Sequence, residues 1–254
     1  MKPNIVKNIS LSIALAKAEF KLRHEGSYLG IFWYLLNPLL TFLLLFLVFS
    51  TRLGQTIDFY PLYLLLGVIM LNFFQQATYD ATKVLMGNRR VIKTINFPLV
   101  SLIASIVLKF LYSHLFEFIV FVLFMFFFPV SFFGIVFYPL ILVLFSSFIF
   151  GVSLILSAVS LIFTDLENIW LFISRLLLFI TPIFYSVEDQ PRLYFFINLF
   201  NPVYYFISAS REVVIYTRVP DFWLVAGMFF WTILALLVGF ISFYKLKGRV
   251  AEKL

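Results

Sequence analysis

The sequence predicts an all-α integral membrane protein with six transmembrane helices, an N-terminal interfacial helix and short re-entrant helices before the last span. Hydrophobic residues make up 63% of the 254 residues and charged residues only 12%, whereas a soluble domain is closer to half apolar and a quarter charged. The apolar residues form long stretches with almost no ionisable side chains, and Lys and Arg gather mostly in every second gap between them. A chain that crosses a bilayer six times needs this arrangement, and a soluble core does not.

Residues 1–28 precede the first span and are predicted to form the interfacial helix. An apolar stripe recurs there at helical spacing, formed by Ile5, Ile9, Ile13, Ala16 and Phe20. The basic residues beside that stripe are Lys7, Lys17 and Lys21. A basic flank next to an apolar stripe suits a helix that lies among anionic lipid headgroups. Apolar residues on the other face, such as Leu11 and Leu15, leave open an ordinary helix packed against protein.

Six stretches approach the length of about 20 apolar residues that one span requires. They cover residues 31–50, 59–79, part of 103–128, 134–163, 169–185 and 222–244. The fourth stretch is long enough to be tilted, or kinked near Pro139. We therefore expect residues 1–254 to form a single membrane domain.

The distribution of basic residues predicts the orientation of the spans. The N-terminal segment, the loop after the second span and the C-terminal tail hold five, four and four of the 19 Lys and Arg residues. An even number of spans puts both termini on one face, and the excess of Lys and Arg identifies that face as cytoplasmic. Because this pattern accounts for the net charge of +7, we expect no nucleic-acid partner.

Residues 80–98 form the loop that is most suited to a protein partner. A short amphipathic helix with a basic flank can dock into a groove on a soluble protein, and the candidate contact residues are Arg89, Arg90, Val91, Ile92 and Lys93. The alternative is a basic cytoplasmic loop with nothing bound to it. The sequence contains neither a phosphate-binding loop nor a dinucleotide-binding glycine motif. Energy for uphill transport would therefore come from a partner or an ion gradient, and we expect no cofactor in this chain.

Residues 188–218 contain apolar runs that are too short to cross a membrane and are broken at Asn201-Pro202. Irregular backbone at membrane depth must face protein or a watery cavity, because lipid cannot bond it. We expect either helices at the mouth of a pathway or a hairpin on the bilayer surface.

Aromatic residues are dense around this segment, and flat rings with hydroxyl groups suit contact with sugars. The candidate pathway residues are Trp33, Tyr34, Phe184, Tyr185, Tyr194, Phe196, Tyr204 and Tyr205. Lipid-facing rings and an interfacial aromatic belt are the alternative, and Trp33 and Tyr34 fit that belt.

Few ionisable residues lie within the spans. His114 and Glu117 are three residues apart and share a helix face, but a metal site needs more ligands than these two. We expect no metal site and interior hydrogen-bond partners instead. Arg175, in the fifth span, is a candidate partner for Glu117 across the bundle.

Several short motifs occur in a fixed order from about residue 15 onward. They are Leu29-Gly30 followed by Trp33 and Pro38, then Asn96-Phe97-Pro98, Phe163 to Leu166, Thr181 to Tyr185, and Asn201-Pro202 followed by Arg211. In this respect the chain resembles the permease subunits of bacterial polysaccharide ABC exporters, which include O-antigen, teichoic-acid and capsule exporters.

The resemblance implies a transport subunit, not an enzyme, in the bacterial inner membrane. Such permeases form a homodimer joined to separately encoded ATP-binding cassette subunits, which hold the ATP and Mg. Residues 80–98 would then contain the helix that couples to the ATPase, and residues 188–218 would form the periplasmic mouth. The implied substrate is a polyprenyl-linked polysaccharide, whose lipid headgroup would meet Lys17, Lys21 and Arg23.

Two other functions remain open at this point. A permease of the same architecture could export a drug or a small lipid. An intramembrane glycan enzyme would require a catalytic carboxylate, for which Glu117 is the buried candidate.

Overall fold

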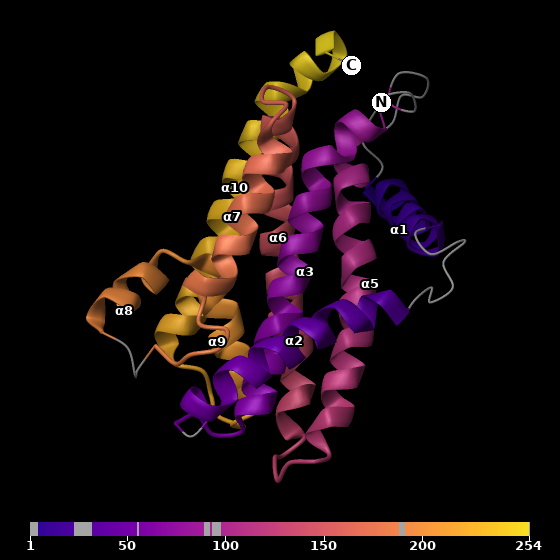
Figure 1. Ribbon diagram of the computed structural model, residues 1–254. Coiled ribbons are helices and arrows are strands. Elements are labelled where there is room, and N and C mark those ends of the chain that lie inside the picture. The colour runs from indigo at the N-terminus through magenta and orange to yellow at the C-terminus, as the bar shows by residue number, and fades with distance from the viewer. Residues whose placement is uncertain are drawn as a thin grey trace.

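A computed structural model describes residues 5–22, 32–54, 56–88, 92, 98–187 and 191–253. All regular elements within these ranges are helices (Figure 1). The short N-terminal helix α1 spans Ile5–Leu22, followed by α2 (Phe32–Leu53), α3 (Tyr60–Gly87) and α5 (Leu99–Met125). The second half contains the 3-10 helix η1 (Phe133–Phe137), α6 (Tyr138–Ser160) and α7 (Leu166–Ile180). The short helices α8 (Arg192–Leu199) and α9 (Pro202–Val214) then precede the long α10 (Phe222–Lys253).

Within the described residues, five helices are long and apolar enough to cross a membrane. They are α2, α3, α5, α6 with its preceding 3-10 turn, and α10. The predicted fifth span is α7, which has 15 residues and is therefore only about 22 Å long. It ends at Ile180 because Thr181 precedes Pro182 and adopts an extended conformation, with ψ at 138°. The chain is thus an all-helical, multi-pass membrane protein, and residues 181–185 of the predicted span are not helical.

Helix α3 is the centre of the bundle. Its most apolar stretch is 78% buried, against 11% for α2, and it packs against α2, α5, α6, α7 and α9. Figure 1 shows α2 crossing the front of the bundle obliquely, while α3, α5, α6, α7 and α10 run along its long axis. Helix α2, the first predicted span, is therefore the least buried of the five candidate spans.

Helices α6 and α10 form the most extensive helix pair. A Cβ atom on Gly151 would lie 2.5 Å from the backbone carbon of Ala235, and one on Gly239 would lie 2.5 Å from the carbonyl oxygen of Gly151. Small residues let membrane helices approach closely, so that dispersion contacts replace the hydrophobic effect that lipid does not supply.

Helix α1 and the C-terminal end of α10 lie toward the same end of the bundle in Figure 1. The end of α3, the start of α5 and the connection between α6 and α7 lie there too, whereas α8, α9 and the turn before α6 lie at the other end. Five of the described helices meet the length and hydropathy of a span, so the even number of passes stays a prediction. Pro139 stands where η1 passes into α6, at the position where a kink is predicted.

Helix α1 packs against α5. Ser12 and Ala16, one turn apart, are buried, and Leu15 packs on the hydrophobic core. From the predicted apolar stripe, Ala16 is buried and Ile13 is half-buried, and the side chains of the other three members lie outside the described part. The face toward the protein therefore includes Leu15, which the sequence left on the opposite side of the helix.

Candidate functional site

The break after α7 brings three helices together at the end of the bundle that carries α8 and α9. Residues 181–185 leave α7, which is an interruption that hydrocarbon cannot satisfy. Side chains from α3 and α9 supply the missing donors. The hydroxyl of Tyr60 donates to the carbonyl oxygen of Phe184 at 3.1 Å, and that of Tyr63 donates to Tyr185 at 2.9 Å.

Arg211 of α9 is the central donor of this site. Its Nη1 donates to the Pro182 carbonyl at 2.6 Å, and its Nη2 donates to the carbonyls of Ile183 and Tyr63 at 2.9 and 3.0 Å. The guanidinium also stacks 3.3 Å from the centre of the Tyr63 ring. With the Tyr185 hydroxyl on Ile180 at 2.6 Å and the Ile183 amide on Thr181 at 2.7 Å, each carbonyl from Ile180 to Tyr185 has a donor.

The cation is fully enclosed, with Arg211 only 2% exposed. Burial lowers the pKa of the guanidinium from its ordinary value, but arginine remains protonated in proteins. Gly67, one turn after Tyr63, makes the room: a Cβ atom there would lie 2.5 Å from Arg211 Nη2. A buried charge that bonds backbone carbonyls in a fixed geometry specifies one arrangement of α3, α7 and α9.

A second polar contact fixes the start of α9. The Asn201 side chain accepts from the Val203 amide at 3.2 Å, as an N-cap before Pro202. Its Nδ2 donates to the Thr181 hydroxyl at 2.9 Å. The break at Asn201-Pro202, which the sequence predicted, and the break at Thr181-Pro182, which it did not predict, therefore contact each other directly.

The sequence indicated Arg211 only through the family resemblance. It missed Tyr60, Tyr63 and Gly67 as its neighbours. Their spacing was the available signal, since Tyr60, Tyr63 and Gly67 share one helix face and a glycine in a helix leaves room for a large side chain.

The structure brings only some of the predicted pathway aromatics together. Phe49, Phe184, Tyr185 and Tyr194 form a series of ring contacts with centres 4.4, 5.3 and 5.7 Å apart. Tyr204 and Tyr205 form a separate pair at 5.3 Å. Helix α8, which carries Tyr194, lies on the opposite side of the molecule from the start of α2 in Figure 1. Trp33, the second residue of α2, is 41% exposed.

Most of the clustered hydroxyl groups are already used within the protein. Tyr185 is buried and donates to Ile180, and Tyr205 donates to the Leu199 carbonyl at 2.9 Å. Tyr194 and Phe196, on α8, are 38% and 58% exposed. They are the predicted pathway residues at the mouth that remain most accessible to a ligand. The side chain of Tyr34 lies outside the described part.

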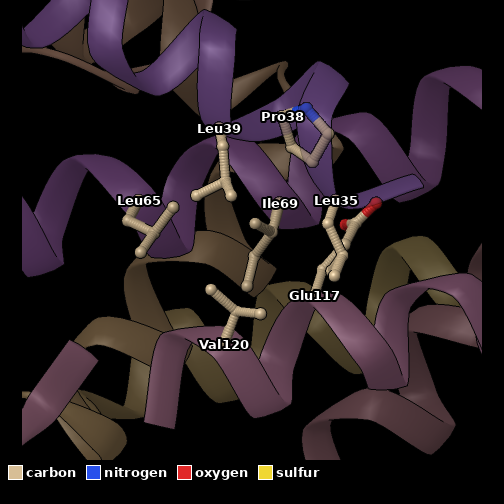
Figure 2. Close-up of a pocket in the computed structure, with 7 residues that line it drawn as sticks. All are labelled: Leu35, Pro38, Leu39, Leu65, Ile69, Glu117 and Val120. Atoms are coloured by element: carbon tan, nitrogen blue, oxygen red, sulfur yellow. The ribbon is translucent and has the colours of Figure 1, made fainter. Parts of the chain in front are cut away.

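Glu117 is buried among α2, α3 and α5. Its Oε1 accepts from Asn72 Nδ2 at 2.8 Å, and Asn72 Oδ1 accepts from Gln76 at 2.7 Å. Figure 2 shows the carboxyl beside Leu35 and Pro38 of α2, in a small pocket that Leu39, Leu65, Ile69 and Val120 complete. The hydrogen-bond donor to this carboxyl is thus the Asn72 amide of α3, which the sequence did not identify.

The predicted pairing of Glu117 with Arg175 is wrong. Ser174 is the residue of α7 buried against α3, so Arg175, one position later, is turned outward and exposed. Within the described residues, Arg175 is not among the ion-paired side chains. His114 lies with Nδ1 at 3.9 Å from Glu117 Oε2 and Nε2 at 2.6 Å from the Tyr138 hydroxyl. Throughout the described ranges, no three His, Cys, Asp or Glu residues gather as a metal site would require.

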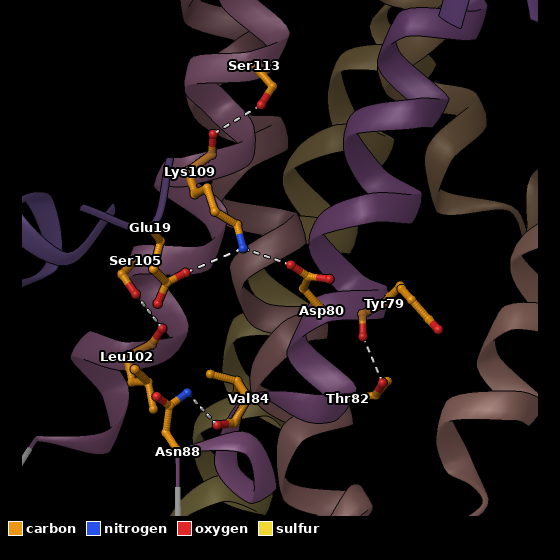
Figure 3. Close-up of polar contacts among 10 residues, drawn as sticks. All are labelled: Glu19, Tyr79, Asp80, Thr82, Val84, Asn88, Leu102, Ser105, Lys109 and Ser113. Carbon is orange, nitrogen blue, oxygen red and sulfur yellow. Dashed lines mark hydrogen bonds and ion pairs between the residues drawn. The ribbon is translucent and has the colours of Figure 1, made fainter. Parts of the chain in front are cut away.

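The end of α3, before residues 88–98, is held from two sides. On one side, Lys83 pairs with Glu167 of α7 at 3.0 Å, and the Tyr79 hydroxyl donates to the same carboxylate oxygen at 2.9 Å. On the other side, Lys109 of α5 bonds Asp80 at 2.7 Å and Glu19 of α1 at 3.4 Å (Figure 3).

The loop and headgroup candidates are only partly visible. Ile92 packs against the core, and its amide donates to the Asn88 carbonyl at 3.0 Å. Arg89, Arg90, Val91 and Lys93 lie outside the described residues, as does Arg23. Lys17 and Lys21 are exposed on α1.

Comparison with known proteins identifies what this architecture resembles. Residues 11–215 match the ABC-2 type transporter family. The chain is 28% identical to an O-antigen export system permease protein RfbA of Klebsiella pneumoniae, over 99% of this chain and 98% of that protein. A protein of the same name from Myxococcus xanthus is 26% identical over 83% of this chain and 82% of its own length.

Proposed function

Because this chain belongs to the ABC-2 type transporter family, we propose that it is the permease of an ATP-driven exporter that moves a polyprenyl-linked, O-antigen-like polysaccharide across the inner membrane. The observation that carries the proposal is the end-to-end similarity to a protein named as an O-antigen export permease. Similarity over nearly the full length of both chains includes the mouth segment together with the spans.

The permease would work with a separate ATP-binding cassette subunit that holds ATP and Mg. This follows from the family, together with the lack of a phosphate-binding loop in the sequence. Residues 80–98 are the proposed docking segment, with Arg89, Arg90, Val91, Ile92 and Lys93 as its contacts. The ion pairs on the two sides of the end of α3 support this role, because movement of residues 80–98 would be transmitted through them to α1, α5 and α7.

The transporter would be a homodimer with both termini cytoplasmic. Apolar side chains that one chain leaves exposed on α2 and α7, such as Leu44, Leu47 and Phe172, are suited to lipid or a second copy. The glycan would leave past Tyr194 and Phe196, and Lys17, Lys21 and Arg23 would meet the lipid headgroup by charge.

The decisive experiment is deletion of the gene in its native host. Loss of the chain should leave lipid-linked polymer on the cytoplasmic side and remove it from the cell surface, and the wild-type gene should restore it. Normal surface polymer with altered drug sensitivity alone would overturn the proposal in favour of a drug or small-lipid exporter. If Glu117→Gln instead abolished a chemical step in vitro, an intramembrane glycan enzyme would replace it.

The pathway assignment has its own test. Phe196→Ala should lower export while the assembled complex and its ATP hydrolysis remain. Phe230→Ala, which removes an equally exposed ring from α10, is the matched control. Equal export by the two variants would show that Phe196 is not part of the glycan pathway.

A further inference from the structure

One buried cation serves two carboxylates from two different helices. Lys109 is 7% exposed, and its Nζ lies 2.7 Å from Asp80 Oδ2 and 3.4 Å from Glu19 Oε2 (Figure 3). Asp80 belongs to α3 and Glu19 to α1, while Lys109 itself belongs to α5. The two carboxylates carry one more negative charge than the lysine can neutralise.

The unequal distances indicate which carboxylate holds the lysine in this conformation. At 2.7 Å the bond to Asp80 is a short charge-assisted hydrogen bond, whereas 3.4 Å to Glu19 is a looser ionic contact. The side chains of Asp80 and Glu19 are 34% and 30% exposed, so each can exchange the lysine for water at modest cost. The ammonium group can therefore shift between them without leaving a fully buried charge unpaired.

Asp80 and Glu19 lie in parts of the protein that sharing Lys109 would link. Asp80 lies two turns before the end of α3, close to where residues 88–98 begin. Glu19 lies in the last turn of α1, which also packs on the bundle through Ser12, Leu15 and Ala16.

We propose that Lys109 is a positioning residue that docks α1 on the bundle, and that Asp80 and Glu19 compete for it. When the end of α3 moves away from α5, Lys109 loses Asp80 and holds Glu19 more firmly; when α3 closes on α5, α1 loosens. The part of this proposal that concerns transport rests on the function proposed above, because the ATPase subunit would move α3 through residues 88–98.

The chain has no cysteine, so a single introduced thiol reports on α1 without background. Ser12→Cys places that thiol on the buried face of α1, where its alkylation by N-ethylmaleimide requires α1 to open from the bundle. Ala18→Cys, on an exposed position of the same helix, is the control for reagent access.

If Asp80 and Glu19 compete for Lys109, replacing them should change the alkylation rate of the nucleotide-free protein in opposite directions. Glu19→Gln should speed alkylation of the Ser12→Cys thiol by about three- to fivefold, which is the scale of a partly exposed ion pair. Asp80→Asn should slow it by about twofold, because Lys109 is left to Glu19 alone. If Asp80→Asn speeds alkylation as Glu19→Gln does, the carboxylates act only as scaffolding and the competition is refuted.

The second arm uses the complete complex with its ATPase subunit. For Ser12→Cys with no other substitution, the alkylation rate should differ between the nucleotide-free and the ATP-trapped complex. Adding Glu19→Gln should remove that difference. An unchanged wild-type rate would refute coupling through Lys109 even if the complex exports glycan. Failure to export glycan at all would instead refute the proposed function, while the nucleotide-free comparison would still decide the competition.

Discussion

Arg211→Met removes the cation that joins α9 to the backbone of residues 181–185. Methionine has a similar length but no donor, so the carbonyl oxygens of Pro182 and Ile183 lose their partners inside the protein. Each unsatisfied buried carbonyl costs about 1–3 kcal/mol, and loss of the stacking on Tyr63 costs about 0.5–2 kcal/mol.

Part of this cost is returned, because the guanidinium no longer has to leave water. The net loss should be about 3 kcal/mol, which for a chain of this size corresponds to a melting temperature lower by about 10 °C. Thermal unfolding of the purified protein in lipid nanodiscs measures this shift. Arg218→Met, at an exposed position after α9, is the matched control and should shift melting by only about 1 °C.

A double-mutant cycle tests the geometry behind this number. Gly67→Ala alone should destabilise the protein, because the new methyl would lie 2.5 Å from Arg211 Nη2. In the Arg211→Met background the flexible thioether can give way, so the second change should cost much less. Additive effects, or equal melting of the Arg211→Met and Arg218→Met variants, would refute the view that Arg211 holds the break together.

Three further outcomes follow from other contacts in the bundle. Gly151→Ala should destabilise the protein by about 1–3 kcal/mol, because the new methyl group would meet the backbone of α10. Gly87→Ala is the control, because a methyl group there meets open space and should be neutral or slightly stabilising. Equal melting temperatures of the two variants would contradict the close α6–α10 contact. Glu117→Leu should cost about 1–3 kcal/mol by leaving Asn72 without its acceptor. Glu117→Gln keeps an acceptor oxygen and should cost clearly less in the same melting assay. Equal melting of the two variants would show that the hydrogen bond to Asn72 contributes nothing measurable. Burial raises the pKa of Tyr216 to about 12. The stability that Tyr216 contributes is therefore complete below its unfolded pKa of about 10 and falls as the pH rises toward 12. Tyr216→Phe should make the melting temperature depend less on pH between about 10 and 12, and parallel curves for the two proteins would argue against this assignment.

The long elements follow from local pattern and could be predicted without tertiary information. Continuous apolar stretches and the placement of Lys and Arg indicated multiple passes and an even number of crossings, because the cost of burying a charge or an open backbone in lipid acts on each residue by itself. The same local logic placed the break at Asn201-Pro202, since proline constrains the residue before it wherever the chain folds.

The expectations that missed concern the ends and the faces of helices. The predicted fifth span ran to Tyr185, although α7 stops at Ile180, because an apolar count does not register that Thr181-Pro182 ends a helix. Arg175 was assigned to Glu117 from depth alone, but rotation of α7 about its axis turns Ser174 inward and Arg175 outward.

The sequence alone therefore determined that the chain crosses a membrane repeatedly, that it breaks at Asn201-Pro202, and which family pattern it follows. The tertiary structure decided what satisfies those breaks and charges: Arg211 finds its acceptors 28, 29 and 148 residues away, and Lys109 takes partners from α1 and α3. Composition and spacing act through neighbouring residues, whereas a donor meets its acceptor only after helix packing has brought distant segments within hydrogen-bonding distance.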